Sequence, residues 1–165
     1  MVHNRKRMAY EYKIVRRVEF SETDMAGIVH YSNFFRYMEA AEHAFFRSIG
    51  FSVVTRNVEP PVGWPRVHAE CDYRRPIRFE DEIEIRMYVT KKKSKSLTYG
   101  FWFRKMDGSE MVDVANGSLT VVCVRHQNGK MKAAMIPKEI AKKIEVVPAK
   151  VLRELTKKSK EPNRK

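Results

Sequence analysis

The chain has 165 residues, and 43% of them are hydrophobic, which is enough for a single domain with a substantial core. No stretch reaches the roughly 20 uninterrupted apolar residues of a membrane-spanning helix, and the N-terminal sequence MVHNRKRMAY lacks the apolar run of a signal peptide, so we expect a cytoplasmic enzyme or binding protein. The net charge of +13 favours a polyanionic partner: nucleic acid, a membrane surface or a phosphate-bearing small molecule.

A first strand and a long helix are predicted in the N-terminal third. Residues 11–20, EYKIVRRVEF, are rich in β-branched and aromatic side chains and favour a strand. Residues 33–49 have helical periodicity over about four turns, with Ser32 or Asn33 available to cap the start and Gly50 to end it. One face of this helix carries Phe34, Tyr37, Met38, Ala41, Phe45, Ser48 and Ile49, and the other carries Arg36, Glu39, His43 and Arg47.

Four further strands are predicted beyond a loop that contains Gly63 and prolines 60, 61 and 65. Residues 67–74 and 82–89 alternate between apolar and polar side chains, and residues 97–105 and 112–124 complete the set. Asp107-Gly108 and Asn128-Gly129 are turn signals, and Pro137 opens a short helix with the sequence PKEIAKKI. The two cysteines, Cys71 and Cys123, lie within these strands without the spacing of metal ligands, so we expect reduced core residues and no metal site.

The C-terminal end concentrates positive charge, because residues 138–165 hold ten basic and four acidic residues. We predict a domain over residues 1–144, with its core at 11–141, and a basic extension over 145–165 that is partly flexible. An antiparallel sheet with one helix is expected to curl around the apolar stripe of that helix. The opposite helix face, with Phe35 and Phe46, still needs cover, which predicts at least a dimer.

The segment SETDMAGIVHYSNFF, residues 21–35, places polar residues and a glycine directly before the long helix. Unpaired N–H groups and the helix dipole stabilise a developing oxyanion at such a helix start, and Gly27 allows close approach of backbone or ligand. A carboxylate held there, Asp24, would attack an acyl carbon or deprotonate a water molecule. Alternatively, Asp24 is only a turn or cap residue.

The sequence ETDMAGIVHYSNFFRYMEAA resembles the signature of hot-dog-fold acyl-CoA thioesterases of the 4-hydroxybenzoyl-CoA thioesterase family. The resemblance runs from about residue 14 to residue 141 and includes FEDEIEIRM and KKKSKSLTY. It implies an α+β fold in which a five-stranded antiparallel sheet wraps one long central helix. It also implies homodimers or homotetramers with active sites at the subunit interface, and hydrolysis of an acyl-CoA thioester to a carboxylic acid and free coenzyme A.

The same resemblance assigns roles to individual residues. Asp24 would be the catalytic nucleophile or general base, and the backbone N–H of Tyr31 the oxyanion donor. Many relatives have a His where this chain has Tyr31, so His30, one position earlier, is either catalytic or a loop residue that orients its neighbours. No metal or redox cofactor is implied, because coenzyme A enters only as part of the substrate. The substrate-binding residues implied are Gly27, His30, Asn33, Glu39, Lys92, Lys93, Ser94 and Lys95, with Arg74, Arg75 and Arg78 contributing across the interface.

Three alternatives stay open at this point. Acyl carrier protein could be the substrate, because its acidic surface would suit the positive charge. A carboxylate on the helix, Glu39 or Glu42, could replace Asp24. A basic nucleic-acid-binding protein without catalysis is the third, with Tyr99, Phe101, Trp102 and Phe103 as a stacking surface, although no nucleic-acid-binding motif supports it. The sequence leaves open whether the acyl group is aromatic or aliphatic.

Overall fold

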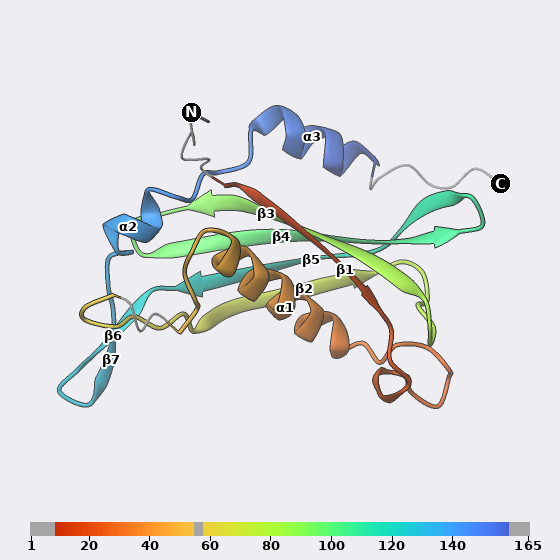
Figure 1. The fold of residues 1–165 in the computed structure, drawn as a ribbon, viewed down its shortest axis with the longest axis horizontal. Helices are drawn as coiled ribbons and strands as arrows, with labels where there is room; N and C mark the ends of the chain where they lie inside the picture. The colour runs from red at the N-terminus through yellow and green to blue at the C-terminus, as the bar shows by residue number, and fades with distance from the viewer. Residues whose placement is uncertain (1–8, 55–57, 159–165) are drawn as a thin grey trace, which may run out of the picture.

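The chain forms a twisted five-stranded sheet with one long helix, α1 (Asn33–Ser48), lying across one face (Figure 1). A computed structural model describes residues 9–54 and 58–158. The strand order is β1-β3-β4-β5-β2, and all neighbouring strands are antiparallel, so the predicted α+β architecture is confirmed. The strands are β1 (Glu11–Arg17), β2 (Arg66–Tyr73), β3 (Glu82–Lys92), β4 (Ser96–Asp107) and β5 (Glu110–Val122).

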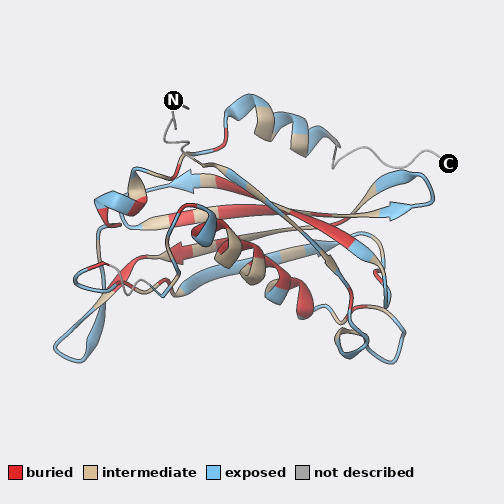
Figure 2. Cartoon of the chain, in the orientation of Figure 1, coloured by how far each residue is buried: buried red, intermediate tan, exposed pale blue. Residues whose placement is uncertain are grey.

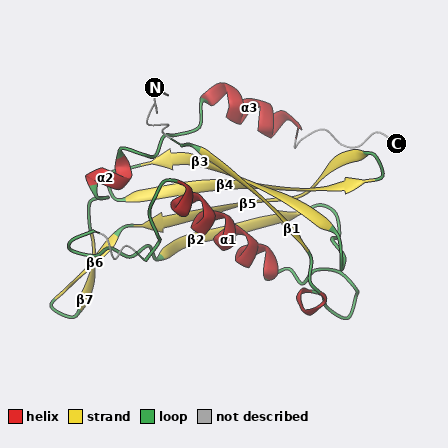
Figure 3. Ribbon diagram, viewed as in Figure 1, coloured by secondary structure: helices red, strands yellow, loops and turns green. Residues whose placement is uncertain are grey.

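Smaller elements surround this sheet (Figure 3). A hairpin of β6 (Val124–Gln127) and β7 (Lys130–Ala133) projects from one end of the molecule, and its predicted Asn128-Gly129 turn is confirmed. The turn between β4 and β5 lies at residues 108 and 109, one position later than predicted, because β4 continues through Asp107. The remaining elements are the 3-10 helix η1 (Phe20–Glu22) and the helices α2 (Lys138–Ala141) and α3 (Ala149–Lys158).

The core lies between α1 and the inward faces of β3, β4 and β5 (Figure 2). Strand alternation sends every second residue of the central strands toward the helix, as the sequence predicted. Helix and sheet approach closely at Gly117, where a Cβ atom would overlap the side chain of Met38. The largest fully buried side chains include Tyr37, Phe45, Phe46, Tyr99, Phe101 and Phe103.

Two side chains of α1 lie differently from the sequence prediction. Phe46 was expected on an uncovered face, but it is fully buried because the loop before β2 brings Trp64 against it, with ring centroids 5.4 Å apart. Phe35 is half-buried against the core rather than open to solvent. Glu42, whose side chain is ionisable, is among the most buried residues of the helix, with 1% of its surface exposed.

The edge strand β2 is more open than its alternating sequence predicts. Val67 and Tyr73 were expected on a buried face, but they are 62% and 46% exposed. The outer side of β2 has no paired strand among the described residues, because β2 pairs only with β5.

Of the two free cysteines, Cys123 is buried and Cys71 is half-buried.

The predicted C-terminal extension contains the helix α3, which lies beyond β3 in Figure 1. The chain before this helix is tied to the sheet by Val147, whose N–H donates to the Val89 carbonyl at 2.8 Å. Residues 159–165, which belong to the part predicted to be flexible, lie outside the described residues. No helix in the described ranges is long and apolar enough to cross a membrane, and no cluster of three metal-ligating side chains occurs within those ranges.

Candidate active site

The segment that joins β1 to α1 forms a closed loop at one end of the sheet. Thr23 pairs with Val29 across the loop, which holds its two arms together. The N–H of Val29 donates to the Ile77 carbonyl at 2.7 Å, so the loop is also fixed to the connection between β2 and β3. The polar side chains of the segment 21–32 therefore lie directly before the first turn of α1, as the sequence predicted.

Asp24 lies in a tight turn at the tip of this loop and is exposed. Its carboxylate oxygen Oδ1 accepts a hydrogen bond from the Ala26 N–H at 2.8 Å, and its carbonyl accepts one from the Gly27 N–H at 2.9 Å. Gly27 has a φ of +71°, a conformation that glycine adopts without strain. No described residue donates a hydrogen bond to Oδ2 of Asp24. The side chain thus shapes the turn with one oxygen and leaves the other toward solvent.

The backbone directly before α1 has one N–H donor, that of Tyr31, without an acceptor among the described residues. The N–H of Asn33 donates to the His30 carbonyl at 2.9 Å, and the N–H of Phe34 donates to the Tyr31 carbonyl at 3.3 Å. Within the described residues, no group accepts a hydrogen bond from the N–H of Tyr31 itself. Such an orphan amide at a helix start is the kind of donor that an oxyanion needs.

The imidazole of His30 organises the same helix start. Its Nδ1 atom lies 2.8 Å from the Ser32 hydroxyl, and the Ser32 N–H points to the same Nδ1 at 3.4 Å. The ring packs against Tyr31 with centroids 4.5 Å apart, while the Tyr31 ring is 61% exposed. Ser32 is the N-cap residue of α1, one of the two positions predicted, but its hydroxyl makes no capping hydrogen bond because it is engaged by His30.

Asn33 is buried and stabilises the loop through a side-chain hydrogen bond. Its side chain is 8% exposed, and its amide donates to the Glu22 carbonyl at 2.7 Å. The same carbonyl accepts a second hydrogen bond from the His30 N–H at 2.9 Å. Asn33 thus contacts the loop backbone that carries Asp24.

Sequence reasoning missed a part-buried ionic cluster under this loop. The Glu22 carboxylate accepts hydrogen bonds from Arg16 at 2.5 Å and from the Tyr37 hydroxyl at 2.9 Å. The Arg16 guanidinium also lies over the Tyr37 ring, 4.4 Å from its centroid. Burial, and then the hydrogen bond to Glu22, raise the pKa of Tyr37, so its hydroxyl remains a donor. No sequence period links these three residues, which come from β1, η1 and α1.

A second cluster lies between the middle of α1 and the start of β2. Arg66 contacts Glu42 at 2.6 Å and Glu39 at 3.1 Å, and Glu39 lies 3.8 Å from His43. Burial raises the pKa of Glu42 to about 7, although Arg66 acts in the opposite direction. Burial also lowers the pKa of His43. Oε1 of Glu42 and the hydroxyl of Tyr99 are both buried, and neither has a hydrogen-bond partner in the described part of the chain.

The basic run at residues 91–96 forms the turn between β3 and β4, at the end of the sheet opposite the loop (Figure 1). Because β3 has 11 residues, its ends are about 35 Å apart. The ammonium of Lys92 donates to the carbonyls of Ala141 and Ile144, at 2.9 and 2.6 Å, and so closes the end of α2. Lys93, Ser94 and Lys95 are exposed. One chain therefore does not bring these residues together with Asp24.

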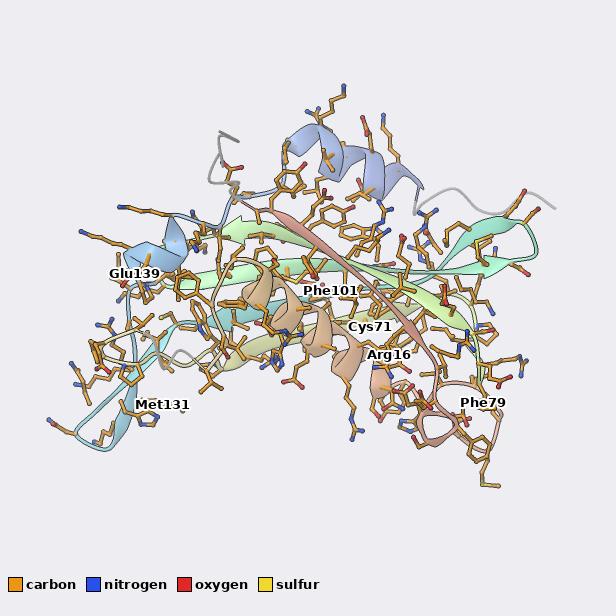
Figure 4. All side chains as sticks on the ribbon, in the orientation of Figure 1. Arg16, Cys71, Phe79, Phe101, Met131 and Glu139 are labelled. Atoms are coloured by element: carbon orange, nitrogen blue, oxygen red, sulfur yellow. The ribbon has the colours of Figure 1, made fainter. Side chains whose placement is uncertain are left out.

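The connection between β2 and β3 brings one cation, Arg78, to the loop of Asp24 in the same chain. Nη1 of Arg78 lies 3.5 Å from the Gly27 carbonyl oxygen. The neighbouring Phe79 packs edge-on against Phe20, with ring centroids 5.7 Å apart. Figure 4 shows Phe79 at this end of the molecule, whereas Met131 and Glu139 mark the opposite end.

The model of the Thioesterase-like superfamily matches residues 18–144 of the chain. The chain belongs to this superfamily. A putative esterase of Aquifex aeolicus is 34% identical over 125 residues, which cover 76% of this chain and 91% of that protein. A 1,4-dihydroxy-2-naphthoyl-CoA hydrolase of Synechococcus sp. is 26% identical over 132 residues, covering 76% of this chain and 84% of that protein.

The fold of this thioesterase-like chain is similar to that of solved thioesterases. The structure of 4-hydroxybenzoyl-CoA thioesterase from Pseudomonas sp. superimposes with a TM-score of 0.71 at 22% identity, covering 81% of this chain and 99% of that one. The predictions of the hot-dog fold and of a thioester hydrolase are therefore confirmed.

The nucleic-acid-binding alternative loses its proposed surface in this superfamily member. Tyr99, Phe101 and Phe103 are fully buried beneath α1 and cannot stack on bases. Trp102 points to the other face of the sheet and packs edge-on against Tyr88. The predicted stacking surface is wrong because alternation along β4 sends three of its four aromatic rings into the core.

Proposed function

We propose that the chain is an acyl-CoA thioesterase that hydrolyses its substrate to a carboxylic acid and free coenzyme A. The observation that carries the proposal is an exposed carboxylate, Asp24, on a loop that ends at the unpaired N–H of Tyr31. Membership of the thioesterase-like superfamily supports the reaction class. The named hydrolase relatives act on coenzyme A thioesters, which supports the substrate class.

The proposed reaction begins at the thioester carbonyl carbon. Asp24 either attacks this carbon, forming an anhydride that water then hydrolyses, or removes a proton from a water molecule that attacks directly. In both routes the carbonyl oxygen gains negative charge, and the N–H of Tyr31 with the dipole of α1 stabilises it. When this oxyanion collapses, the carbon–sulfur bond breaks and the coenzyme A thiolate leaves and takes up a proton; the acyl group remains as the Asp24 anhydride in the first route, before its hydrolysis, and as the carboxylic acid in the second. Water and this carboxylate are sufficient, so no metal or redox cofactor takes part.

The substrate is proposed to lie along the loop and helix start. The glycine at position 27 allows close approach to the backbone, and His30 and Glu39 flank the acyl group. Asn33 acts through the loop carbonyl that it holds. The phosphates of coenzyme A are bound by Lys93, Ser94 and Lys95, which are exposed, and Lys92 adds positive charge while its ammonium is held by α2.

Such a substrate requires two copies of the chain. The basic run and Asp24 of one chain are separated by the length of β3, which exceeds the reach of one pantetheine arm. The open edge of β2, with exposed Val67 and Tyr73, is where a second copy would pair, because an unpaired edge strand with apolar side chains favours strand addition. We propose a homodimer, or a homotetramer built from it, in which each site uses both chains.

The test is the pair of variants Asp24→Asn and Asp24→Ala, assayed for thiol release from short, long and aromatic acyl-CoAs. We expect kcat to fall by about 100-fold or more on every substrate that the parent hydrolyses, because a general base or nucleophile contributes at least that factor. Asp107→Asn is the matched control, since Asp107 is an exposed aspartate at the β4–β5 turn. Near-parent turnover in folded Asp24 variants would refute the role.

A single turnover in ¹⁸O-labelled water separates the two routes. Label that enters the Asp24 carboxylate identifies nucleophilic attack, and label only in the product acid identifies general-base catalysis.

Comparing the same acyl group on coenzyme A and on acyl carrier protein tests the substrate class, because a preference for the carrier protein would replace the coenzyme A proposal.

A further inference from the structure

Glu22 attaches the N-terminal arm of the Asp24 loop to β1 and α1, while Val29 attaches the other arm to the connection between β2 and β3. Its backbone carbonyl accepts hydrogen bonds from the His30 N–H at 2.9 Å and from the Asn33 side chain at 2.7 Å. Oε2 of its carboxylate accepts from the Tyr37 hydroxyl at 2.9 Å and from the Glu19 N–H at 2.8 Å. Oε1 accepts from Arg16 at 2.5 Å. One residue of η1 thus contacts both β1 and α1.

Asp24 itself is bonded only within its own turn, as far as the described residues show. The described hydrogen bonds of Asp24 all go to residues 26–28 of the same turn. Tyr31 is exposed, and its carbonyl accepts a weak hydrogen bond from Tyr73 at 3.3 Å. The position of Asp24 relative to the Tyr31 amide therefore depends on the pairing of residues 22–24 with residues 28–30. Glu22 begins that pairing.

We infer that Glu22 is a positioning residue of the active site: without touching substrate, its carboxylate fixes the Asp24 arm of the loop against the start of α1. This inference rests on the proposed function. Its geometric basis is that Arg16, on a strand, and Tyr37, on a helix, each donate a hydrogen bond to a different oxygen of the Glu22 carboxylate. Figure 4 shows Arg16 beside the N-terminal half of α1. A carboxylate with both oxygens occupied cannot rotate freely, so the backbone that carries it is held as well.

The test is Glu22→Gln, which keeps the size of the side chain but replaces one acceptor oxygen with a donor. The amide would face either Arg16 or the Tyr37 hydroxyl, so one contact of the cluster is lost. We expect kcat to fall about 10- to 100-fold with KM within twofold of the parent, because a displacement near 1 Å of a catalytic group has effects of that size.

Glu84→Gln is the matched control. Glu84 is also a part-buried glutamate that contacts cations, with Arg86 at 2.7 Å and Lys13 at 3.3 Å, but it lies on β3 away from the loop. Both variants are expected to lower the melting temperature, whereas only Glu22→Gln is expected to lower kcat. Equal kcat values for the two variants, with similar losses of melting temperature, would overturn the positioning role.

A double-mutant cycle links the effect to Asp24. In an Asp24→Asn background, Glu22→Gln is expected to change the residual kcat less than threefold, because no catalytic carboxylate remains to be displaced. A full additional loss in that background would overturn the inference. Should Asp24→Asn alone leave kcat unchanged, the proposed function fails instead.

Tyr37→Phe removes one hydroxyl from the same cluster and is expected to lower kcat about three- to tenfold, so it carries the test if Glu22→Gln does not fold.

Discussion

The buried carboxyl of Glu42 predicts a pH-dependent stability. Its side chain is 1% exposed, Oε2 contacts Arg66 at 2.6 Å, and Oε1 has no hydrogen-bond partner among the residues that the structure describes. Burial raises its pKa from 4.5 to about 7. Between these values the folded chain holds a proton that the unfolded chain has released. The stability that this carboxyl contributes is therefore complete below pH 4.5 and is lost as the pH rises through 7.

The size of this loss follows from the two pKa values. The span from 4.5 to about 7 corresponds to about 3 kcal/mol of unfolding free energy at 25 °C. Glu42→Gln keeps the shape of the side chain without its titration. Arg66 keeps a partner in this variant, because Glu39 lies 3.1 Å away. We expect the unfolding free energy of the variant minus that of the parent to increase by about 2 to 3 kcal/mol as the pH rises from 5 to 8.

The assay is urea denaturation of parent and variant at several pH values from 5 to 8, with the free energy extrapolated to water. Glu39→Gln is the control on the same helix, and because Glu39 is 47% exposed its ion pair with Arg66 is expected to contribute less than about 1 kcal/mol at any pH. A difference between Glu42→Gln and parent that stays constant over this pH range would refute the reasoning.

Two further predictions concern the basic turn and the helix contact. Lys93→Ala combined with Lys95→Ala is expected to raise KM for acyl-CoA roughly tenfold with kcat unchanged, because each exposed charge contributes about 0.7 kcal/mol. Lys92→Ala should instead lower the melting temperature, since its ammonium closes α2. An unchanged KM for the double variant would contradict this. Gly117→Ala is expected to destabilise the chain by about 1 to 3 kcal/mol, because the added methyl overlaps Met38, and a stability equal to the parent by urea denaturation would contradict the contact.

The regular elements could be predicted from the sequence because their signals are local. The helix over residues 33–49 ends one residue earlier in the structure, at Ser48, and the alternation of residues 82–89 identifies the inward side of β3. Errors arose where a distant segment decided burial. Phe46 lies on the polar side by helical periodicity, but Trp64 covers it from a loop that no periodicity describes.

The part of the candidate site that lies in one contiguous segment could be predicted from the sequence, and the part that depends on distant segments could not. The segment around Asp24 is contiguous, so its place before the helix followed from the sequence. The contact of Glu22 with Arg16 and Tyr37 depends on how β1 crosses the start of α1, and no local pattern contains that information. The separation of Asp24 from Lys93 depends on the direction in which β3 runs, which became visible only in the folded chain.

The two oxygens of Asp24 have separate surroundings, one bound to the Ala26 amide and one open to solvent. An asparagine would keep an oxygen for the first contact, because its amide supports the same kind of turn, but it would lack the negative charge. Loop shape and reactivity are therefore separable in this scaffold. A single base change in the gene could convert such a protein from a hydrolase into a receptor that retains its ligand unaltered.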